Sequence, residues 1–122
     1  MGRRFTGIIL IFIIILTACN HTDTQLKGQL DLIESIIEKD GEQAYKMLKG
    51  MNRDSISSKS EYARYSLLMS MAMDKNYIDI TSDSIIAPAV EYYRKHGSND
   101  YKMKALYYRG VIERNAGNNE SA

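Results

Sequence analysis

The chain has one side chain whose position and chemistry stand out. Cys19 is the only cysteine among 122 residues, so no disulfide can form within the chain. A thiol can also act as a nucleophile or accept a covalent modification. Leu16, Thr17 and Ala18 come directly before it and are apolar or small. The chemistry available to Cys19 therefore depends on the segment on its N-terminal side.

That segment has the organisation of an export signal. Arg3 and Arg4 precede an uninterrupted apolar run over residues 8–16, and polar residues 20–24 follow the cysteine. A helix needs about 20 apolar residues to cross a bilayer, whereas the apolar part of a signal peptide has about 7 to 15. We therefore expect residues 1–18 to be a signal peptide. An uncleaved signal anchor is the alternative.

The tetrad from Leu16 to Cys19 resembles the lipobox of bacterial lipoproteins. The resemblance implies that the Cys19 thiol receives a diacylglycerol and that cleavage between Ala18 and Cys19 makes Cys19 the first mature residue. Each buried methylene contributes about 0.8 kcal/mol, so several acyl chains would hold a domain on a membrane. We expect a membrane-anchored lipoprotein that faces the periplasm, with residues 19–25 as a polar tether. Whether it sits in the inner or the outer membrane stays open.

The other reactive residues form no recognisable catalytic or metal-binding pattern. His21 and His96 lack the spacing of metal ligands. The segment 74–79 is similar to a calcium loop, but Ile78 occupies a ligand position and the glycine is missing. No nucleophile, base and orienting acid can be assembled. We therefore expect a non-enzymatic protein without a metal or cofactor.

Charge argues against a nucleic-acid partner. Removal of residues 1–18 would leave 104 residues with 14 basic and 15 acidic side chains, mixed along every segment. A nucleic-acid-binding domain is expected to be basic and to cluster its lysines and arginines. The length fits one small domain.

Apolar spacing predicts helices in most of this domain. Leu26, Leu30, Ile33 and Ile37 recur at steps of three and four, which places them on one helix face. Similar stripes, broken by glycine-containing or serine-rich segments, predict helices at about 25–40, 42–51, 60–75, 83–96 and 100–116. The third of these carries enough apolar residues to be buried on more than one side.

The last two helices carry further expectations. If Ser84 is the N-cap of the fourth helix, Pro88 lies in an early turn, whereas Ser82 as the N-cap predicts a kink. Gly97 and Gly117 are the expected helix ends. In the fifth helix the residues expected to face inward are Met103, Leu106, Tyr107, Gly110 and Val111.

The C-terminal segment resembles a tetratricopeptide repeat, a helix-turn-helix unit of about 34 residues. Ala105, Gly110, Gly117 and Ala122 stand at intervals of five, seven and five residues. The resemblance implies that Leu106 fills a pocket for a large residue and that Gly110 allows a helix to approach closely. It also implies that Gly117 makes the turn and that Ala122 begins the second helix.

The segments Tyr62–Leu68, Asp74–Ile78 and Ala105–Gly110 extend this resemblance to the N-terminal part of tetratricopeptide-repeat lipoproteins of Gram-negative bacteria. It implies an all-α fold of antiparallel helical hairpins in an α-solenoid, over residues 26–122. Hairpins are expected at about 26–51 and 60–96, with an incomplete third at 100–122. Leu106, Tyr107 and Val111 would then be partly uncovered, which favours self-association.

Tyrosine is abundant, with nine residues and no tryptophan. The pairs Tyr92-Tyr93 and Tyr107-Tyr108 each place one ring inward and the other about 100° around the helix. Tyr92 and Tyr108 are therefore candidates to line a peptide-binding groove. The alternative is that all four pack with their hydroxyls in water. Ser55 and Ser84 lie in Asp-Ser-Ile triplets similar to a bacterial O-glycosylation signal, and both can equally serve as turn or capping residues.

These observations favour a membrane-tethered helical-repeat scaffold that acts through protein or peptide contacts. Two other functions stay open. One is the input domain of a tetratricopeptide-repeat transcriptional regulator, and the other is a binding lipoprotein of a glycan-uptake system.

Overall fold

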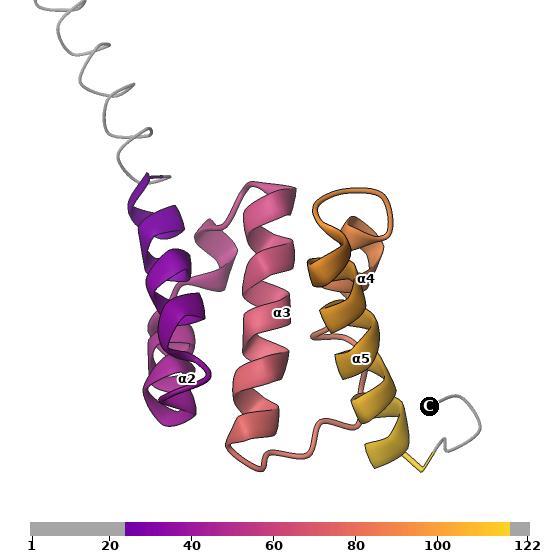
Figure 1. Ribbon diagram of the computed structural model, residues 1–122. Coiled ribbons are helices and arrows are strands. Elements are labelled where there is room, and N and C mark those ends of the chain that lie inside the picture. Colours follow the sequence, from indigo (N-terminus) through magenta and orange to yellow (C-terminus); the bar gives the residue numbers. More distant parts are fainter. Residues whose placement is uncertain (1–23, 118–122) are drawn as a thin grey trace, which may run out of the picture. The chain divides into compact units, whose positions relative to one another are not determined.

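The computed structural model describes residues 24–117 (Figure 1). Residues 1–18 and the site residues Ala18, Cys19 and Ala122 lie outside the described residues. The chain divides into two compact units, Met1–Asp31 and Leu32–Ala122. The second unit contains the helices discussed below.

The described part of the chain contains helices and no strand, which confirms the all-α fold class. Residues 24–36 are helical, including two positions that the sequence assigned to the tether. The further helices are α2 (Gly41–Gly50), the short 3-10 helix η1 (Arg53–Ser55), α3 (Lys59–Lys75), α4 (Ala87–Tyr93) and α5 (Asn99–Asn115). None of the described helices is long and apolar enough to cross a membrane.

Three helices begin at a polar capping residue. The side chains of Asp40, Ser58 and Ser98 accept hydrogen bonds from the third backbone N–H of α2, α3 and α5, over 3.0, 3.3 and 3.3 Å. Each bond satisfies a donor that the helix itself cannot pair. Polar residues between the apolar stripes therefore set where these helices start.

The start of α4 differs from the prediction. The helix has only seven residues, and its N-cap is Ile86, without a side-chain hydrogen bond, instead of Ser82 or Ser84. Pro88 is the second residue of the helix, where its missing N–H breaks no helical hydrogen bond. Residues 83–86 form a turn in which the Ala87 N–H bonds the Asp83 carbonyl at 2.9 Å. The proline therefore lies in the first turn without a kink.

Two glycines with positive φ lie after α4 and α5, but only the one after α5 stands at the end of its helix. Gly97 has φ of 78° and Gly117 has φ of 87°, a left-handed conformation that other residues rarely adopt. A Cβ at Gly97 would also come within 3.0 Å of the Tyr93 ring. Gly117 directly follows the C-cap of α5, as predicted, whereas α4 ends at Tyr93, four residues before Gly97.

Helix α3 is the centre of the second unit and contacts α2, α4 and α5 (Figure 1). The expectation that it is buried on more than one side is confirmed, because eight of its residues are buried. Its two buried hydroxyls are both satisfied: Ser66 donates to the Ile85 carbonyl and Ser70 to the Ser66 carbonyl. Such pairing avoids the cost of burying a lone polar group.

The predicted stripes of the early helices form much of the core. Ile33, Ile37, Ala44 and Leu48 are each at most 1% exposed, and Leu30 in the first unit is also fully buried. Burying a side chain of this size contributes about 1.5 to 3 kcal/mol. From α4 and the segment before it, the core gains Ile86, Ala89, Val90 and Tyr93.

The inward face of α5 is partly mispredicted. Its buried residues are Ala105, Val111 and Ile112, whereas Met103, Leu106 and Tyr107 are 68%, 45% and 63% exposed. Leu106 therefore does not fill a buried pocket in the described structure. Leu106 and Tyr107 are partly uncovered, as the sequence also predicted, whereas Val111 is buried and contradicts that prediction. Apolar residues occur on both sides of this helix, so spacing alone did not identify the side that packs.

Candidate binding surface

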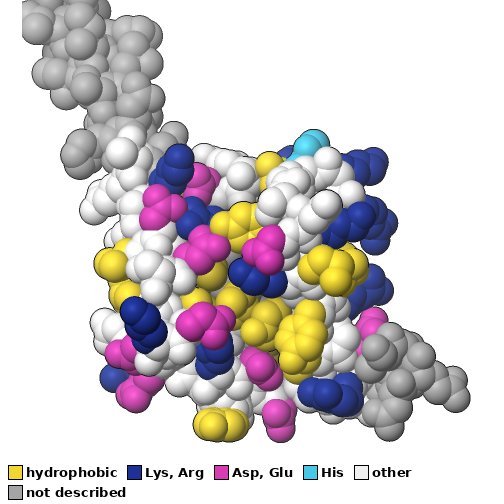
Figure 2. All heavy atoms as spheres, viewed as in Figure 1, with side chains coloured by type: hydrophobic (Ala, Val, Ile, Leu, Met, Phe, Trp, Pro, Cys, Tyr) yellow, Lys and Arg dark blue, Asp and Glu magenta, His cyan; other side chains and the backbone are white. Residues whose placement is uncertain are grey.

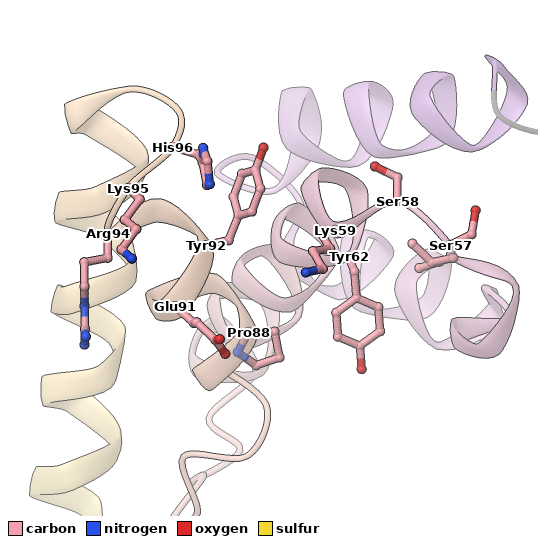
Figure 3. A pocket seen from close by; sticks show the side chains of 11 residues that line it. Ser57, Ser58, Lys59, Tyr62, Pro88, Glu91, Tyr92, Arg94, Lys95 and His96 are labelled. Carbon is pink, nitrogen blue, oxygen red and sulfur yellow. The ribbon is translucent and has the colours of Figure 1, made fainter.

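A hollow of about 610 Å³ lies between the first turn of α3 and the end of α4. We call it the first hollow. Figure 3 shows Tyr92 and His96 projecting side by side from the α4 end, while Lys59 and Tyr62 project from α3. The segment before α3 contributes Ile56, Ser57 and Ser58, and the α4 side also contributes Pro88, Glu91, Arg94 and Lys95.

Aromatic rings form part of this lining. The ring centroids of Tyr92 and His96 are 4.8 Å apart, and Tyr92 meets the buried Tyr93 edge-on at 5.3 Å. The Arg53 guanidinium lies 5.8 Å from the centre of the Tyr62 ring, within cation–π range. Packing on Tyr93 holds Tyr92 at the edge of the first hollow.

A second hollow of about 230 Å³ adjoins the first, because Tyr62 lines both. Its lining includes Tyr45, Tyr65 and Met69 together with Lys49 and Arg53. The Lys49 ammonium lies 5.3 Å from the centre of the Tyr45 ring. The two hollows therefore combine half-buried tyrosine rings with long cationic side chains.

The charge of the two hollows is one-sided. Five lysine and arginine side chains line them, against one acidic residue, Glu91: these are Lys49, Arg53, Lys59, Arg94 and Lys95. None of these basic groups forms an ion pair within the described residues. Since the whole chain carries only one net positive charge, this surface concentrates positive charge that is balanced elsewhere.

Lys59 is notable because it is the first residue of α3. The N-terminus of a helix carries a partial positive charge, so it favours acidic side chains and disfavours lysine. Its position is therefore not explained by the stability of α3.

Tyr108, the other groove candidate, occupies a different environment. It borders a gap of only about 10 Å³, at the limit of what a water molecule needs. Burial, with added repulsion from the carboxylates of Asp74 and Glu38, raises the pKa of Tyr108 to about 12. Its ring meets Tyr107 edge-on at 5.0 Å. Tyr108 is therefore half-buried and lies outside the linings of the two hollows.

A network centred on Glu34 was not anticipated from the sequence. Arg64 on α3 donates to one carboxylate oxygen, with Nε at 2.9 Å, and the Tyr101 hydroxyl of α5 donates to the other at 2.7 Å. Tyr101 also stacks on Tyr93, with ring centroids 5.1 Å apart. Burial and the Glu34 hydrogen bond raise the pKa of Tyr101 to about 12. The network joins three helices, and 67 residues separate Glu34 from Tyr101.

The face seen in Figure 2 has a different character from the hollows. Acidic and basic side chains alternate there around an apolar area. Two ion pairs join segments far apart in the sequence: Glu34 pairs with Arg64, and Glu38, in the turn before α2, pairs with Lys75 of α3.

The remaining candidate residues fall into no common site. Within residues 24–117, no three His, Cys, Asp or Glu side chains are placed to hold a metal ion. His21 lies outside the described residues, and Ser55 and Ser84 are exposed in η1 and in the turn before α4. Ala105 is fully buried, and Gly110 is half-buried.

No protein-family model, curated protein or solved structure matches this chain. The surface must therefore be interpreted from its own geometry.

Proposed function

We propose that this protein is a non-enzymatic scaffold of tetratricopeptide-like helical hairpins, held at a membrane by lipid on Cys19. It binds a protein or peptide on the periplasmic side. The proposal combines the lipobox-like N-terminus with the helical second unit and its hollowed surface.

The two adjoining hollows are the observation that carries this proposal. Binding sites combine concavity with apolar and aromatic lining and a few polar groups that orient the ligand. The first hollow has Tyr62, Tyr92 and Pro88 for contact area, and its cations supply orientation. Tyrosine gives large contact area at low entropic cost, which suits recognition of peptide chains.

The helical arrangement is compatible with a repeat scaffold. Helices α2 and α3 pack on each other, as do α3 and α4 and then α4 and α5, so each helix contacts its neighbour in sequence. Stacking of this kind is what helical-hairpin repeats use to bury their apolar faces. Helices α3 and α5 also contact each other, as the first helices of successive hairpins in a repeat scaffold would.

The anchoring part of the proposal is tested by lipid labelling in a Gram-negative host. The full chain should incorporate radiolabelled palmitate and sediment with membranes. Cys19→Ala should lose the label and leave the membrane fraction. Retention of Cys19→Ala in membranes through washing at high salt would contradict lipid anchoring.

The binding part is tested by photocrosslinking in the same cells. A photoreactive phenylalanine analogue at Tyr92 should give discrete covalent adducts with a partner, whereas the same analogue at Lys102, an exposed residue of α5, should not. Equal adducts from both positions, or none from Tyr92, would contradict a binding role for the hollows.

A further inference from the structure

We infer that the two hollows bind an acidic, extended peptide segment, whose carboxylates pair with Lys59, Lys95 and Arg53 while its backbone lies across Tyr62 and Tyr92. This inference rests on the proposed function and specifies the chemistry of the partner.

Charge complementarity is the first argument. The basic groups around the hollows have no acidic partner in the described chain, although five other basic residues do form ion pairs. Mutual repulsion among unpaired cations costs free energy, which an anionic ligand would relieve. Glu91 is the only acidic residue in the lining of the two hollows, so a carboxylate ligand experiences little electrostatic repulsion there.

The position of Lys59 is the second argument. A lysine in the first turn of a helix opposes the helix dipole, yet Lys59 begins α3 at the edge of the first hollow. An acidic ligand placed there would interact favourably with both the ammonium group and the helix terminus. The same residue is thus unfavourable for the free helix and favourable for the complex.

The shape of the surface is the third argument. Tyr62 lines both hollows, so a ligand that lies over its ring can reach the cations on either side. An extended peptide advances about 3.3 Å per residue, and a few residues can therefore present carboxylates to both hollows. The flat Tyr62 and Tyr92 rings suit contact with a peptide backbone.

An anionic membrane surface is the competing occupant. A bilayer is flat on the scale of this domain, and it would contact exposed lysines without entering the hollows or covering Tyr62. The recessed, tyrosine-lined shape therefore favours a peptide, and the experiment below includes vesicles to separate the two.

The test measures binding of fluorescein-labelled hexaglutamate to the full chain in a neutral detergent. Hexaglutamine with the same label is the matched neutral probe. We expect hexaglutamate to bind at least about tenfold more tightly, which corresponds to one strong charge contact, and to weaken as salt screens the charges. Equal binding of both probes would overturn the inference.

Charge reversal locates the site. Lys59→Glu and Lys95→Glu should each weaken hexaglutamate binding about tenfold, and Tyr92→Ala should weaken it severalfold. Lys102→Glu makes the same charge change on α5, outside both hollows, and should change binding less than about twofold. Equal losses from Lys59→Glu and Lys102→Glu would overturn the assignment to the hollows.

Vesicles of phosphatidylglycerol decide between peptide and membrane. If Lys59→Glu abolishes vesicle binding and leaves hexaglutamate binding intact, the inference is overturned in favour of a lipid surface. The outcomes also separate the two proposals: discrete crosslinks from Tyr92 with no preference for hexaglutamate would retain the scaffold and remove the acidic partner. Lys95→Gln provides a milder variant if a reversal impairs folding.

Discussion

The Glu34 network and the two hollows differ in how their charged side chains are paired. At the network, Glu34 accepts hydrogen bonds from Arg64 and Tyr101, and the Arg64 and Glu34 side chains are only 16% and 28% exposed. Around the hollows, Lys59 and Lys95 have no ion-pair partner within the described residues. The first arrangement links helices, whereas the second leaves charge available to a ligand.

This difference gives a criterion for separating structural from functional charges. A partly buried pair is destabilising to break, because the remaining partner keeps a desolvated charge without compensation. An exposed, unpaired lysine can be replaced at little cost to the fold. Stability and binding should therefore respond to different sets of substitutions, and the following variants test that separation in order of expected effect.

The largest effect on stability is expected from Arg64→Ala. It leaves Glu34 without its guanidinium partner in a partly buried position, and we expect a loss of about 1 to 3 kcal/mol. Urea unfolding followed by circular dichroism measures this loss. Lys95→Ala is the matched control on the hollow side and should lie within about 0.5 kcal/mol of the original chain. Equal losses of stability for the two variants would contradict the separation of structural charges from ligand-binding charges.

A smaller loss is expected from Tyr101→Phe. The substitution removes the 2.7 Å hydrogen bond to Glu34 and keeps the ring that stacks on Tyr93. One such bond contributes about 0.5 to 1.5 kcal/mol, with charged acceptors at or above the upper end. The same unfolding measurement detects the change. An unaltered midpoint would show that Arg64 alone satisfies Glu34.

Alkaline pH should lower the free energy of unfolding, because two partly buried tyrosines would lose their protons. The pKa values of Tyr101 and Tyr108 are raised to about 12 from the usual 10, mainly by burial. The unfolded chain therefore releases these protons first, so the stabilisation is complete below pH 10 and is lost as pH rises toward 12. Unfolding midpoints between pH 9 and pH 12 measure the slope. The double variant Tyr101→Phe and Tyr108→Phe should show a shallower decline, and an identical slope would contradict this origin.

The smallest effect is expected from Lys59→Glu, and its sign is opposite. An acidic residue at the start of α3 complements the helix dipole and should stabilise the fold by about 0.3 to 1 kcal/mol. Differential scanning calorimetry measures the shift in Tm. The same variant should weaken hexaglutamate binding about tenfold. Destabilisation would indicate that Lys59 has a structural partner in solution.

The spacing of apolar residues in the sequence predicted many of the buried core residues correctly, but it did not predict which face of α5 is buried. Ile33, Ala44 and Leu48 lie on single apolar stripes, and all are buried as predicted. In α5, Leu106 is as apolar as Ile112, so only the contacts with α3 and α4 decide which one is covered. The start of α4 was also missed, because Ser82 and Ser84 were the expected N-caps, whereas the helix begins after Ile86, which has no capping side chain.

The binding surface was only partly accessible to sequence reasoning. Tyr92 was a candidate because tyrosines are abundant and paired, and it lines the first hollow. Sequence reasoning missed Lys59, Tyr62 and Lys95. Lys59 and Tyr62 lie on α3 and Lys95 follows α4, so these residues come together only when the long connection between the two helices has folded. Glu34 and Tyr101 were missed for the same reason, since no local pattern links residues 67 positions apart.

The most direct test of the account is amide chemical-shift mapping of the ¹⁵N-labelled full chain during titration with hexaglutamate. We predict that the shifts concentrate around Lys59, Tyr62, Tyr92 and Lys95. In Lys59→Glu they should require about tenfold more hexaglutamate, while its unfolding midpoint is unchanged or higher. Shifts centred on Glu34 and Tyr101, or scattered evenly over the exposed lysines, would contradict it.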